Sequence, residues 1–289
     1  MKLIKFFRYL IEFFIIMILF LIFKIIGVKI SSYVSGKVFR LIGPLLRPKK
    51  TILNNFKIAL PHASANEIKN HISEMWNYYG RILAEYSFLN NFRNNSKTEM
   101  IKIKGKEILD NIIKNNENVI FVSGHFDNFE LMAMTLEKSG IKLAAIYRPL
   151  NNLFMNRIIE ILRKKYICKN QIKKGRSNIR NLLKLFNDGH SIALMIDQRV
   201  SESIQSPFFG KDAYTTTIPA QFVKKFKCKV VPIYIERKNN VNFEVTVYKP
   251  LNFEEKETIS EITQKLNKNL EQMILLNPSK WIWSHNRWK

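Results

Sequence analysis

The sequence has 289 residues, which is enough for one large α/β domain whose core needs no disulfide or metal ion to stabilise it. It contains 47 Lys and Arg against 23 Asp and Glu, and the net charge of +24 favours an anionic partner: a membrane surface, a nucleic acid, a phosphorylated substrate or an acidic protein. A solvated basic face that reflects a Lys-rich composition is the alternative. The two cysteines are far apart, which is typical of reduced cytosolic thiols and not of a disulfide or metal site.

An unbroken apolar run of 11 residues lies near the N-terminus at 13–23, and it extends to 10–26 with its flanking positions. As a helix the longer segment is about 26 Å long, so both a short membrane span and a deeply inserted monotopic helix fit it. A cleaved signal peptide begins in the same way, but no convincing Ala-x-Ala site follows. Basic residues flank both ends and do not set an orientation. We expect an N-terminal membrane-anchor helix.

Two helical segments follow the anchor, at 31–46 and 64–92, where apolar side chains recur every three or four positions. Core packing is the simplest explanation of the apolar stripe at 68–86 in the second segment. Residues 90–97 are polar and turn-like. The pattern divides the chain into a membrane anchor at 1–30, a helical lead-in at 31–100 and an α/β domain at 101–289.

The most informative segment is VIFVSGHFDNFE, at residues 119–130. Its apolar run at 119–122 is followed by Ser-Gly-His, which is typical of a buried strand that ends in a turn. His125 is therefore expected at the carboxyl end of a strand, where open α/β sheets bind their ligands. From Asp127 onward the apolar spacing becomes helical, which predicts Asp127 as the N-cap and places Glu130 in the first turn.

The spacing of His125 and Glu130 predicts an acid–base site. A carboxylate in the first helical turn is kept ionised by the helix dipole, and we expect Glu130 to reach back and hold the ring of His125. An imidazole that gives its Nδ1 proton to a carboxylate has Nε2 free to accept a proton from a hydroxyl group, as acyl transfer requires. The alternatives are a capping box of Asp127 and Glu130, and a histidine with only a structural role.

A second His-x4-Glu pair, His62 and Glu67, serves as an internal comparison. It follows Pro61, it encloses a second capping box from Ser64 to Glu67, and no apolar strand precedes it. The spacing alone is therefore weakly informative, and the buried strand in front of His125 is what favours that site.

Two further predicted strands each end in a charged residue. The strand at 142–147 ends at Arg148, and the strand at 191–196 brings Asp197 to its carboxyl end. Between them, residues 157–184 contain ten Lys and Arg and a single acid, the densest basic stretch in the chain. Nucleic acid is one ligand for such a stretch, but no RNA-binding motif or helix-turn-helix pattern accompanies it.

The C-terminal third completes the predicted fold. Strands at 230–236 and 241–248 form a hairpin, and residues 260–276 form a closing helix. Strands that alternate with helices predict an α/β fold with a mixed, mostly parallel sheet flanked by helices. Three of the four tryptophans lie at 278–289, where they either form a membrane-interface belt or pack over the sheet.

Two adjacent aromatic residues, Phe208 and Phe209, lie in a predicted loop at 206–210. The threonines at 215–217 are expected to cap a helix that runs through Phe226.

The order of these motifs resembles the lipid A biosynthesis lauroyl/myristoyl acyltransferases, within the wider lysophospholipid acyltransferase superfamily. The resemblance covers nearly the whole chain, and six motifs in the same order are more specific than any one of them. Besides the N-terminal apolar anchor, the motifs are GHFDNFE at 124–130, YRPLNN at 147–152, Arg163, MIDQ at 195–198, PFFG at 207–210 and the ending PSKWIWSHNRWK.

The resemblance implies transfer of a fatty acyl chain from an acyl carrier protein thioester to a hydroxyl of a phosphorylated lipid A precursor of the Kdo-lipid IVA type. It implies catalytic roles for His125 and Glu130, supporting roles for Arg163 and Asp197, and neither a metal ion nor a small cofactor. It also implies anchoring to the bacterial inner membrane with the catalytic domain on the cytoplasmic side. The list of predicted substrate-binding residues comprises Arg148, which its strand-end position adds, Arg163, Asp197, Phe208 and Phe209.

Two alternatives stay open at this point. Within the superfamily, the acceptor is another lysolipid, such as a mannosylated phosphoinositide. In another class, the chain is a non-catalytic membrane-anchored protein whose charge binds anionic lipid or nucleic acid, and a variant without His125 then keeps its function.

Overall fold

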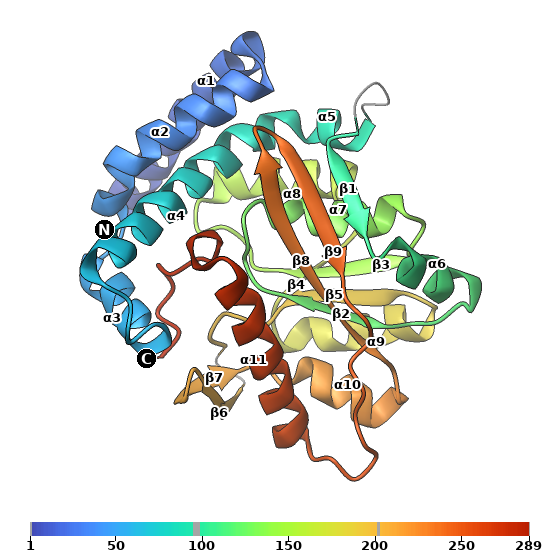
Figure 1. Ribbon diagram of the computed structural model, residues 1–289. Coiled ribbons are helices and arrows are strands. Elements are labelled where there is room, and N and C mark those ends of the chain that lie inside the picture. The colour runs from blue at the N-terminus through green and yellow to red at the C-terminus, as the bar shows by residue number, and fades with distance from the viewer. Residues whose placement is uncertain (1, 95–98, 201–202, 289) are drawn as a thin grey trace.

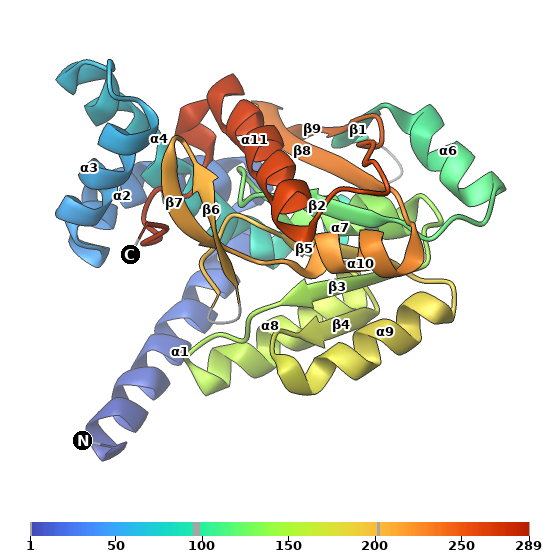
Figure 2. The same ribbon diagram turned by 90° about the horizontal axis from the view of Figure 1, so that it is seen from below.

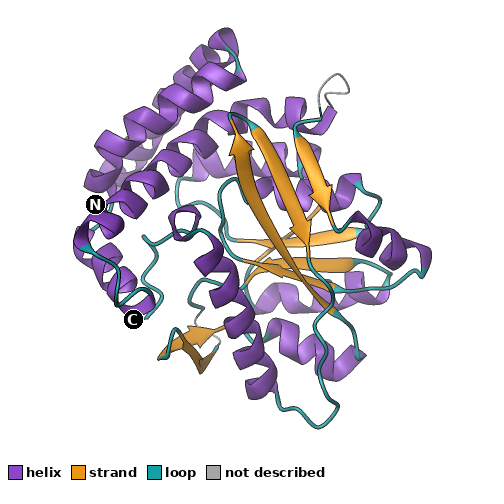
Figure 3. Ribbon diagram, in the orientation of Figure 1, coloured by secondary structure: helices purple, strands orange, loops and turns teal. Residues whose placement is uncertain are grey.

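The computed structural model describes residues 2–94, 99–200 and 203–288. Its central feature is a seven-stranded sheet with the strand order β1-β9-β8-β2-β5-β3-β4 (Figure 1). Neighbouring strands in this sheet are parallel except β8 and β9, which confirms the predicted mixed, mostly parallel α/β sheet (Figure 3). The strands are β1 (Ile101–Lys104), β2 (Ile120–Ser123), β3 (Leu143–Tyr147), β4 (Asn170–Lys173), β5 (Ser191–Met195), β8 (Val230–Asn239) and β9 (Asn242–Val247).

Two groups of helices flank this sheet (Figure 1). Helices α7 and α8 both contact α5 on one side, and α9, α10 and α11 lie on the other, where Phe186 of α9 packs edge to face on Phe222 of α10. Strand β2 is buried along its whole length between the two groups, as a continuous apolar strand requires. The helices are α5 (Leu89–Asn94), α6 (Lys106–Lys114), α7 (Glu130–Lys138), α8 (Leu153–Tyr166), α9 (Ile179–Asn187), α10 (Ile218–Phe226) and α11 (Ile259–Leu276).

Helix α1 (Lys2–Ile26) carries the N-terminal apolar segment, and in Figure 2 it projects from the rest of the molecule with the N-terminus at its tip. Its segment Leu3–Ile26 is long and apolar enough to cross a membrane, and only a small part of it is buried in the protein. The expected N-terminal helix is therefore present, and it is longer than its apolar run. Gly27, with φ 81°, ends it, because that backbone conformation is strained for any residue with a Cβ.

The helical lead-in consists of α2 (Val28–Leu46), α3 (Lys49–Ala59), α4 (Ala65–Glu85), the short η1 (Tyr86–Phe88) and α5. The capping box of Ser64 and Glu67 at the start of α4 is confirmed. The prediction of one helix through residue 92 is wrong, because the chain changes to a 3-10 turn at Tyr86. Helix α5 also occupies residues 90–94 of the predicted turn, and residues 95–97 lie outside the described residues.

The boundaries at residues 30 and 100 stay predictions. Side chains from all three predicted segments, including Phe20, Phe56 and Phe121, belong to one hydrophobic core.

The predicted loop at 206–210 is instead part of a separate antiparallel hairpin, β6 (Ile204–Phe208) and β7 (Lys211–Thr215). Its turn residues, Phe209 and Gly210, both have positive φ angles, which is the backbone geometry of a tight hairpin turn. Helix α10 follows at Ile218 with Pro219 in its first turn. Thr217 is its N-cap residue but makes no capping bond with its own side chain, whereas the Thr216 hydroxyl accepts from the Ile218 N–H at 3.4 Å, so the threonine run does bind the helix start.

After η3 (Pro278–Lys280) the C-terminal segment packs against the lead-in helices, and Asn55 of α3 donates to the carbonyls of Trp283 and His285 at 2.8 and 2.7 Å. Trp281 and Trp283 are fully buried, and Trp288 stacks on Phe208 with ring centroids 5.4 Å apart. These tryptophans are therefore packed inside the protein and do not form a membrane-interface belt, but their partners are Phe126, Phe56 of α3 and Phe208 of the hairpin, so they do not cover the sheet as the second expectation supposed. Phe126, next to His125, pairs with Trp281 as an isolated antiparallel bridge, so the end of the chain lies beside the predicted site.

Candidate active site

Buried polar contacts build the turn between β2 and α7. Asp127 has a positive φ of 39°, and α7 begins only at Glu130, after an N-cap residue whose side chain makes no capping bond. The prediction that Asp127 caps this helix, alone or in a box with Glu130, is therefore wrong. Its carboxylate instead accepts hydrogen bonds from the backbone N–H and the guanidinium of Arg237, at 2.8 and 3.0 Å. Strand β8 thereby holds the turn that presents His125.

The imidazole of His125 is held by Asp197, with Nδ1 2.8 Å from Oδ1. The expectation that Glu130 holds this ring is wrong. Strands β2 and β5 are parallel neighbours with Ser123 opposite Met195, so the residues two positions beyond each strand meet at the same edge of the sheet. The two partners are 72 positions apart in the chain, and only the strand order brings them together.

Asp197 is 2% exposed, and both of its carboxylate oxygens accept hydrogen bonds. Its Oδ2 accepts hydrogen bonds from the backbone N–H of His125 and from Nε1 of Trp281, each at 2.8 Å. Burial raises the pKa of Asp197, but the charge and hydrogen bonds of His125 and the Trp281 hydrogen bond outweigh it and lower the pKa to about 2. The carboxylate is therefore ionised near neutral pH and orients the Nδ1 proton of the ring.

The second ring nitrogen of His125, Nε2, lies on the side of the ring away from Asp197. The side chain is 17% exposed, and its ring packs edge to face on Phe129 at 4.6 Å. Nε2 lies 3.4 Å from Nε2 of Gln198, the residue after Asp197. With Nδ1 bound to the carboxylate, Nε2 is the ring nitrogen whose position would allow it to accept a proton from a hydroxyl group.

Glu130 forms a buried ion pair with Arg163 of α8. The Arg163 Nε lies 3.1 and 3.2 Å from the two carboxylate oxygens, and its Nη2 and the hydroxyl of Tyr86 also bind Oε1. The side chains of Arg163 and Glu130 are 11% and 7% exposed. Burial by itself lowers the pKa of Arg163, but the Glu130 charge outweighs it, so that this pKa is raised. The pair links α7 to α8.

Two cations lie at the ends of neighbouring strands near this site. Arg148 follows β3 and Lys174 follows β4. Tyr147 lies opposite Lys173 in the parallel register, and the Lys174 N–H donates to the Tyr147 carbonyl at 2.8 Å. Burial, and then the charge of Arg148, lower the pKa of Lys174, whereas Asp197 raises it. The charges of these strand ends therefore act on one another and on the Asp197 carboxylate.

Phe208 is fully buried, and it packs against Trp288 and beneath the guanidinium of Arg287, 4.9 Å from its ring centroid. Arg287 is itself buried, and its Nη2 donates to the Thr215 hydroxyl at 2.7 Å. Burial lowers the pKa of Arg287 to about 10 despite the opposing charge of Asp197. These contacts fasten the hairpin to the end of the chain. A substrate contact by Phe208 or Phe209 stays a prediction.

The second His-x4-Glu pair has no comparable surroundings. His62 is exposed in the turn before α4, and Glu67 bonds the backbone N–H of Ser64 at 2.7 Å as part of its capping box. Glu67 therefore caps the start of α4, which is the structural role that the sequence predicted for it.

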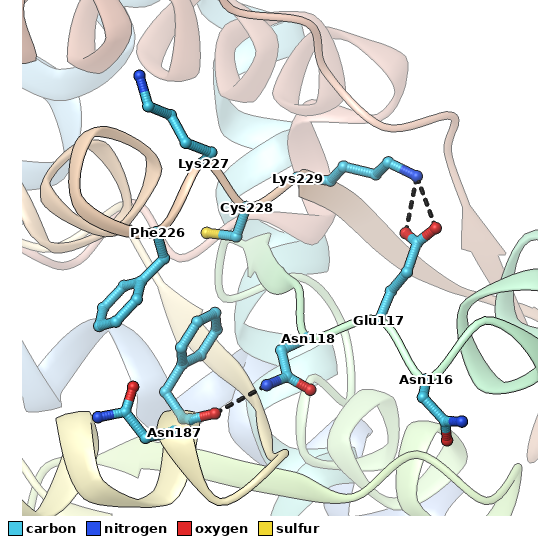
Figure 4. A pocket seen from close by; sticks show the side chains of 9 residues that line it. Asn116, Glu117, Asn118, Asn187, Phe226, Lys227, Cys228 and Lys229 are labelled. Atoms are coloured by element: carbon cyan, nitrogen blue, oxygen red, sulfur yellow. Dashed lines mark hydrogen bonds and ion pairs between the residues drawn. The ribbon is translucent and has the colours of Figure 1, made fainter.

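A surface pocket lies at the opposite edge of the sheet, where β2 and β8 begin (Figure 4). It contains the Glu117 and Lys229 ion pair at 2.7 Å and the Cys228 thiol, whose pKa burial raises to about 11. A thiol with this pKa is not an activated nucleophile. No group of three His, Cys, Asp or Glu side chains within the described ranges is arranged to hold a metal ion.

Sequence reasoning found His125, Asp197, Glu130 and Arg163 but paired the first with the wrong carboxylate. Sequence reasoning did not assign Gln198, Lys174 or Trp281 to the site. Gln198 stands in the quoted MIDQ motif, and Lys174 in the basic stretch, so both had a local signal. Trp281 had no local signal that connected it to Asp197, because the two residues are 84 positions apart and meet only through the tertiary fold.

Comparison with known proteins identifies the family of the chain. The chain matches the family described as bacterial lipid A biosynthesis acyltransferase over residues 1–289. It is 21% identical over 264 residues to the lipid A biosynthesis palmitoleoyltransferase of Escherichia coli (strain K12), which covers 90% of this chain and 85% of that protein. It is 22% identical over 243 residues to the lipid A biosynthesis myristoyltransferase of the same organism, covering 81% and 73%.

A third relative, the lipid A biosynthesis acyltransferase 2 of Shigella flexneri, is 24% identical over 185 residues, covering 62% of this chain and 58% of that protein. The family match spans all the motifs from the N-terminal helix to the C-terminal tryptophans, and it confirms the expected enzyme class. The chain belongs to the bacterial lipid A biosynthesis acyltransferase family, and it is an acyltransferase.

Proposed function

We propose that the protein transfers a fatty acyl chain from an acyl carrier protein thioester to a hydroxyl of a lipid A precursor of the Kdo-lipid IVA type. The observation that carries the proposal is the His125 and Asp197 pair at the carboxyl edge of the sheet, with Nδ1 bound and Nε2 available. A hydroxyl is a weak nucleophile at neutral pH, and an oriented imidazole activates it.

In the proposed step, Nε2 of His125 removes the proton of the acceptor hydroxyl while the oxygen attacks the thioester carbonyl. The tetrahedral intermediate then expels the thiolate, and the imidazolium returns its proton to that sulfur. The products are the ester and the free thiol of the carrier. The ionised Asp197 stabilises the imidazolium between the two proton transfers, as a buried carboxylate beside a catalytic histidine does.

We assign Glu130 to the site through Arg163 and not through the ring of His125. The Glu130 carboxylate starts α7 five positions after His125, and its pair with Arg163 and Tyr86 ties the catalytic turn to α8. In this role Glu130 and Arg163 hold the geometry in which the acceptor hydroxyl meets Nε2. A displacement of about 1 Å at such a site costs on the order of 100-fold in rate.

The cations around the site fit anionic substrates. Arg148 and Lys174 are offered as ligands for the phosphate or carboxylate groups of the acceptor, since both follow strands whose ends lie beside Asp197. The basic stretch at 157–184 is offered as the surface that meets the acidic carrier protein. With α1 as anchor, we place the enzyme at the cytoplasmic side of the inner membrane.

Mass spectrometry of lipid A tests the proposal. Cells that lack the gene are complemented with the wild-type protein, with His125→Ala or with His62→Ala. We expect the wild type and His62→Ala to restore the mass of one acyl chain, and His125→Ala not to restore it. Lipid A that is unchanged by loss of the gene contradicts the proposed acceptor.

A further inference from the structure

Helix α2 has small side chains on its inner face. Its buried residues are all serines and glycines, and an added Cβ at Gly36 or Gly43 meets α4 atoms at 2.1 and 2.4 Å. The serines satisfy their hydroxyls there, as Ser35 does by donating to the Gly80 carbonyl at 2.6 Å. The buried residues of the helix are Ser31, Ser32, Ser35, Gly36 and Gly43.

The outer face of α2 is apolar, which reverses the usual arrangement of a surface helix. Leu41 is 79% exposed and Leu45 is 85% exposed. A contiguous exposed stripe of this kind on a folded protein marks an interaction surface. Its large apolar residues are Ile30, Tyr33, Val34, Val38, Leu41, Ile42, Leu45 and Leu46.

Charge and position indicate which partner covers this stripe. It continues from the exposed apolar surface of α1, with only Gly27 between the two helices. Lys37 lies within the stripe, over the ring of Tyr33 at 5.5 Å, as a lysine does when its stem lies on apolar surface and its ammonium group reaches polar surroundings. Further exposed basic residues stand at both ends of the helix, at Lys29, Arg47, Lys49 and Lys50. Apolar residues bordered by cations fit an anionic bilayer surface.

We propose that α2 is a second membrane element, which lies along the bilayer surface with its apolar stripe inserted at the level of the head groups. The inference rests on the proposed function only in taking the acceptor to be a lipid of the same membrane. Gly27 makes the change of direction between α1 and α2 without strain, since its φ of 81° suits glycine.

The same helix is connected to the catalytic turn. Ser32 of α2 donates to Oε1 of Glu85 at 2.6 Å, and Oε2 of Glu85 accepts from the side-chain amide of Asn128 at 2.8 Å. Glu85 is fully buried and also pairs with Arg237, which holds Asp127. A helix seated on the bilayer thus holds the turn of His125 at a set distance from the lipid surface.

Site-specific fluorescence tests the position of α2 in the full-length protein. Leu41→Cys is labelled with an environment-sensitive fluorophore in a Cys228→Ser background, because Cys168 is fully buried and does not react. The matched control is Asn111→Cys, an exposed position on α6, which lies across the molecule from α2 in Figures 1 and 2. The protein is reconstituted into phosphatidylethanolamine vesicles that contain phosphatidylglycerol.

We expect the Leu41 label to shift to shorter wavelength, to be quenched by lipids with a nitroxide near the head group, and to be shielded from aqueous iodide. The Asn111 label should remain fully accessible to iodide. Equal iodide quenching at the two positions overturns the proposal. Shielding from iodide without quenching by the nitroxide lipid also overturns it, since that pattern belongs to a contact between protein copies. Neither readout depends on acyl transfer, so failure here is distinct from failure of the proposed function.

A kinetic test uses the double variant Leu41→Glu with Leu45→Glu, which leaves α1 intact. We expect its rate on acceptor lipid in vesicles to fall several-fold, and its rate on acceptor dispersed in detergent to match the wild type. Asn111→Glu is the control for added charge. Equal rates of the double variant and the wild type on vesicles overturn the inference.

Discussion

The segments at 62–67 and 125–130 have the same His-x4-Glu spacing and different roles in the structure. In neither segment does the glutamate hold the histidine. Glu67 caps its own helix at an exposed site, whereas Glu130 is buried in an ion pair with Arg163. The buried strand before His125 and its neighbour β5, which supplies Asp197, make the difference. The His-x4-Glu spacing therefore identifies candidate residues, but contacts with residues distant in sequence, such as Asp197, determine their roles.

The largest expected effect separates the two histidines. His125→Ala should lower acyl transfer by roughly 10²- to 10⁴-fold, because it removes the general base. His62→Ala should leave the rate unchanged, since that ring is exposed in a turn. Rates are measured with membrane fractions that contain equal amounts of each protein. Similar losses from the two substitutions would show that the comparison has no catalytic meaning.

Asp197→Asn tests whether this carboxylate, and not Glu130, serves the ring. The amide keeps the size of the side chain but loses the charge that stabilises an imidazolium, so we expect kcat to fall on the order of 10²- to 10³-fold with a smaller change in KM. Single-turnover rates with acyl carrier protein substrate measure the chemical step. A variant with wild-type kcat would refute the assigned role of Asp197.

The free energy of unfolding of the Glu130→Gln variant tests whether the two glutamates have different structural roles. Loss of the Glu130 charge leaves Arg163 buried without its partner, and we expect a loss of about 3 kcal/mol in the free energy of unfolding. A residue that merely capped a helix would tolerate the same change. Glu67→Gln is the matched control and should leave the unfolding midpoint nearly unchanged. Urea unfolding in detergent, followed by circular dichroism, measures both, and equal midpoints for the two variants would contradict the buried-pair interpretation.

The pH dependence of stability reports on Asp197 directly. Its pKa is about 2 in the folded protein, below the ordinary value of 3.8, so its ionised form contributes about 2 kcal/mol to stability. Because the folded pKa is depressed, this contribution is present above about pH 4 and is lost as the pH falls toward 2. The difference in unfolding free energy between the wild type and Asp197→Asn should therefore narrow across this range. A difference that stays constant from pH 5 to pH 2 would argue against the ionised pair.

The smallest expected effect concerns the basic stretch at 157–184. Lys164 and Lys169 are exposed, and reversing both to Glu should raise the KM for acyl carrier protein substrate a few-fold and weaken its salt dependence. The value of kcat should hardly change, because these charges steer encounter and take no part in the chemistry. Lys256→Glu, exposed on a distant loop, is the control. A double variant that matches the wild type at low salt would favour a solvated basic face without a partner.

The sequence alone determined the elements that depend on local pattern. The apolar run before Ser-Gly-His located β2, and a comparable run before Asp197 located β5, because buried parallel strands consist of continuous apolar residues. His125 and Asp197 were therefore both assigned to strand ends. The apolar anchor helix and the Ser64 capping box were predicted for the same reason, since each depends only on neighbours in the chain.

Only the tertiary structure decided which of these residues meet. The strand order makes β5 the neighbour of β2, and the turn of Asp127 is held by Arg237 on a third strand, so the helix starts later than its local pattern predicts. The reversed face of α2 was also invisible in its periodicity, because a helical repeat does not say which side faces the protein. These outcomes depend on hydrogen bonds and ion pairs between residues distant in sequence. Their energies are set by burial, which the fold creates.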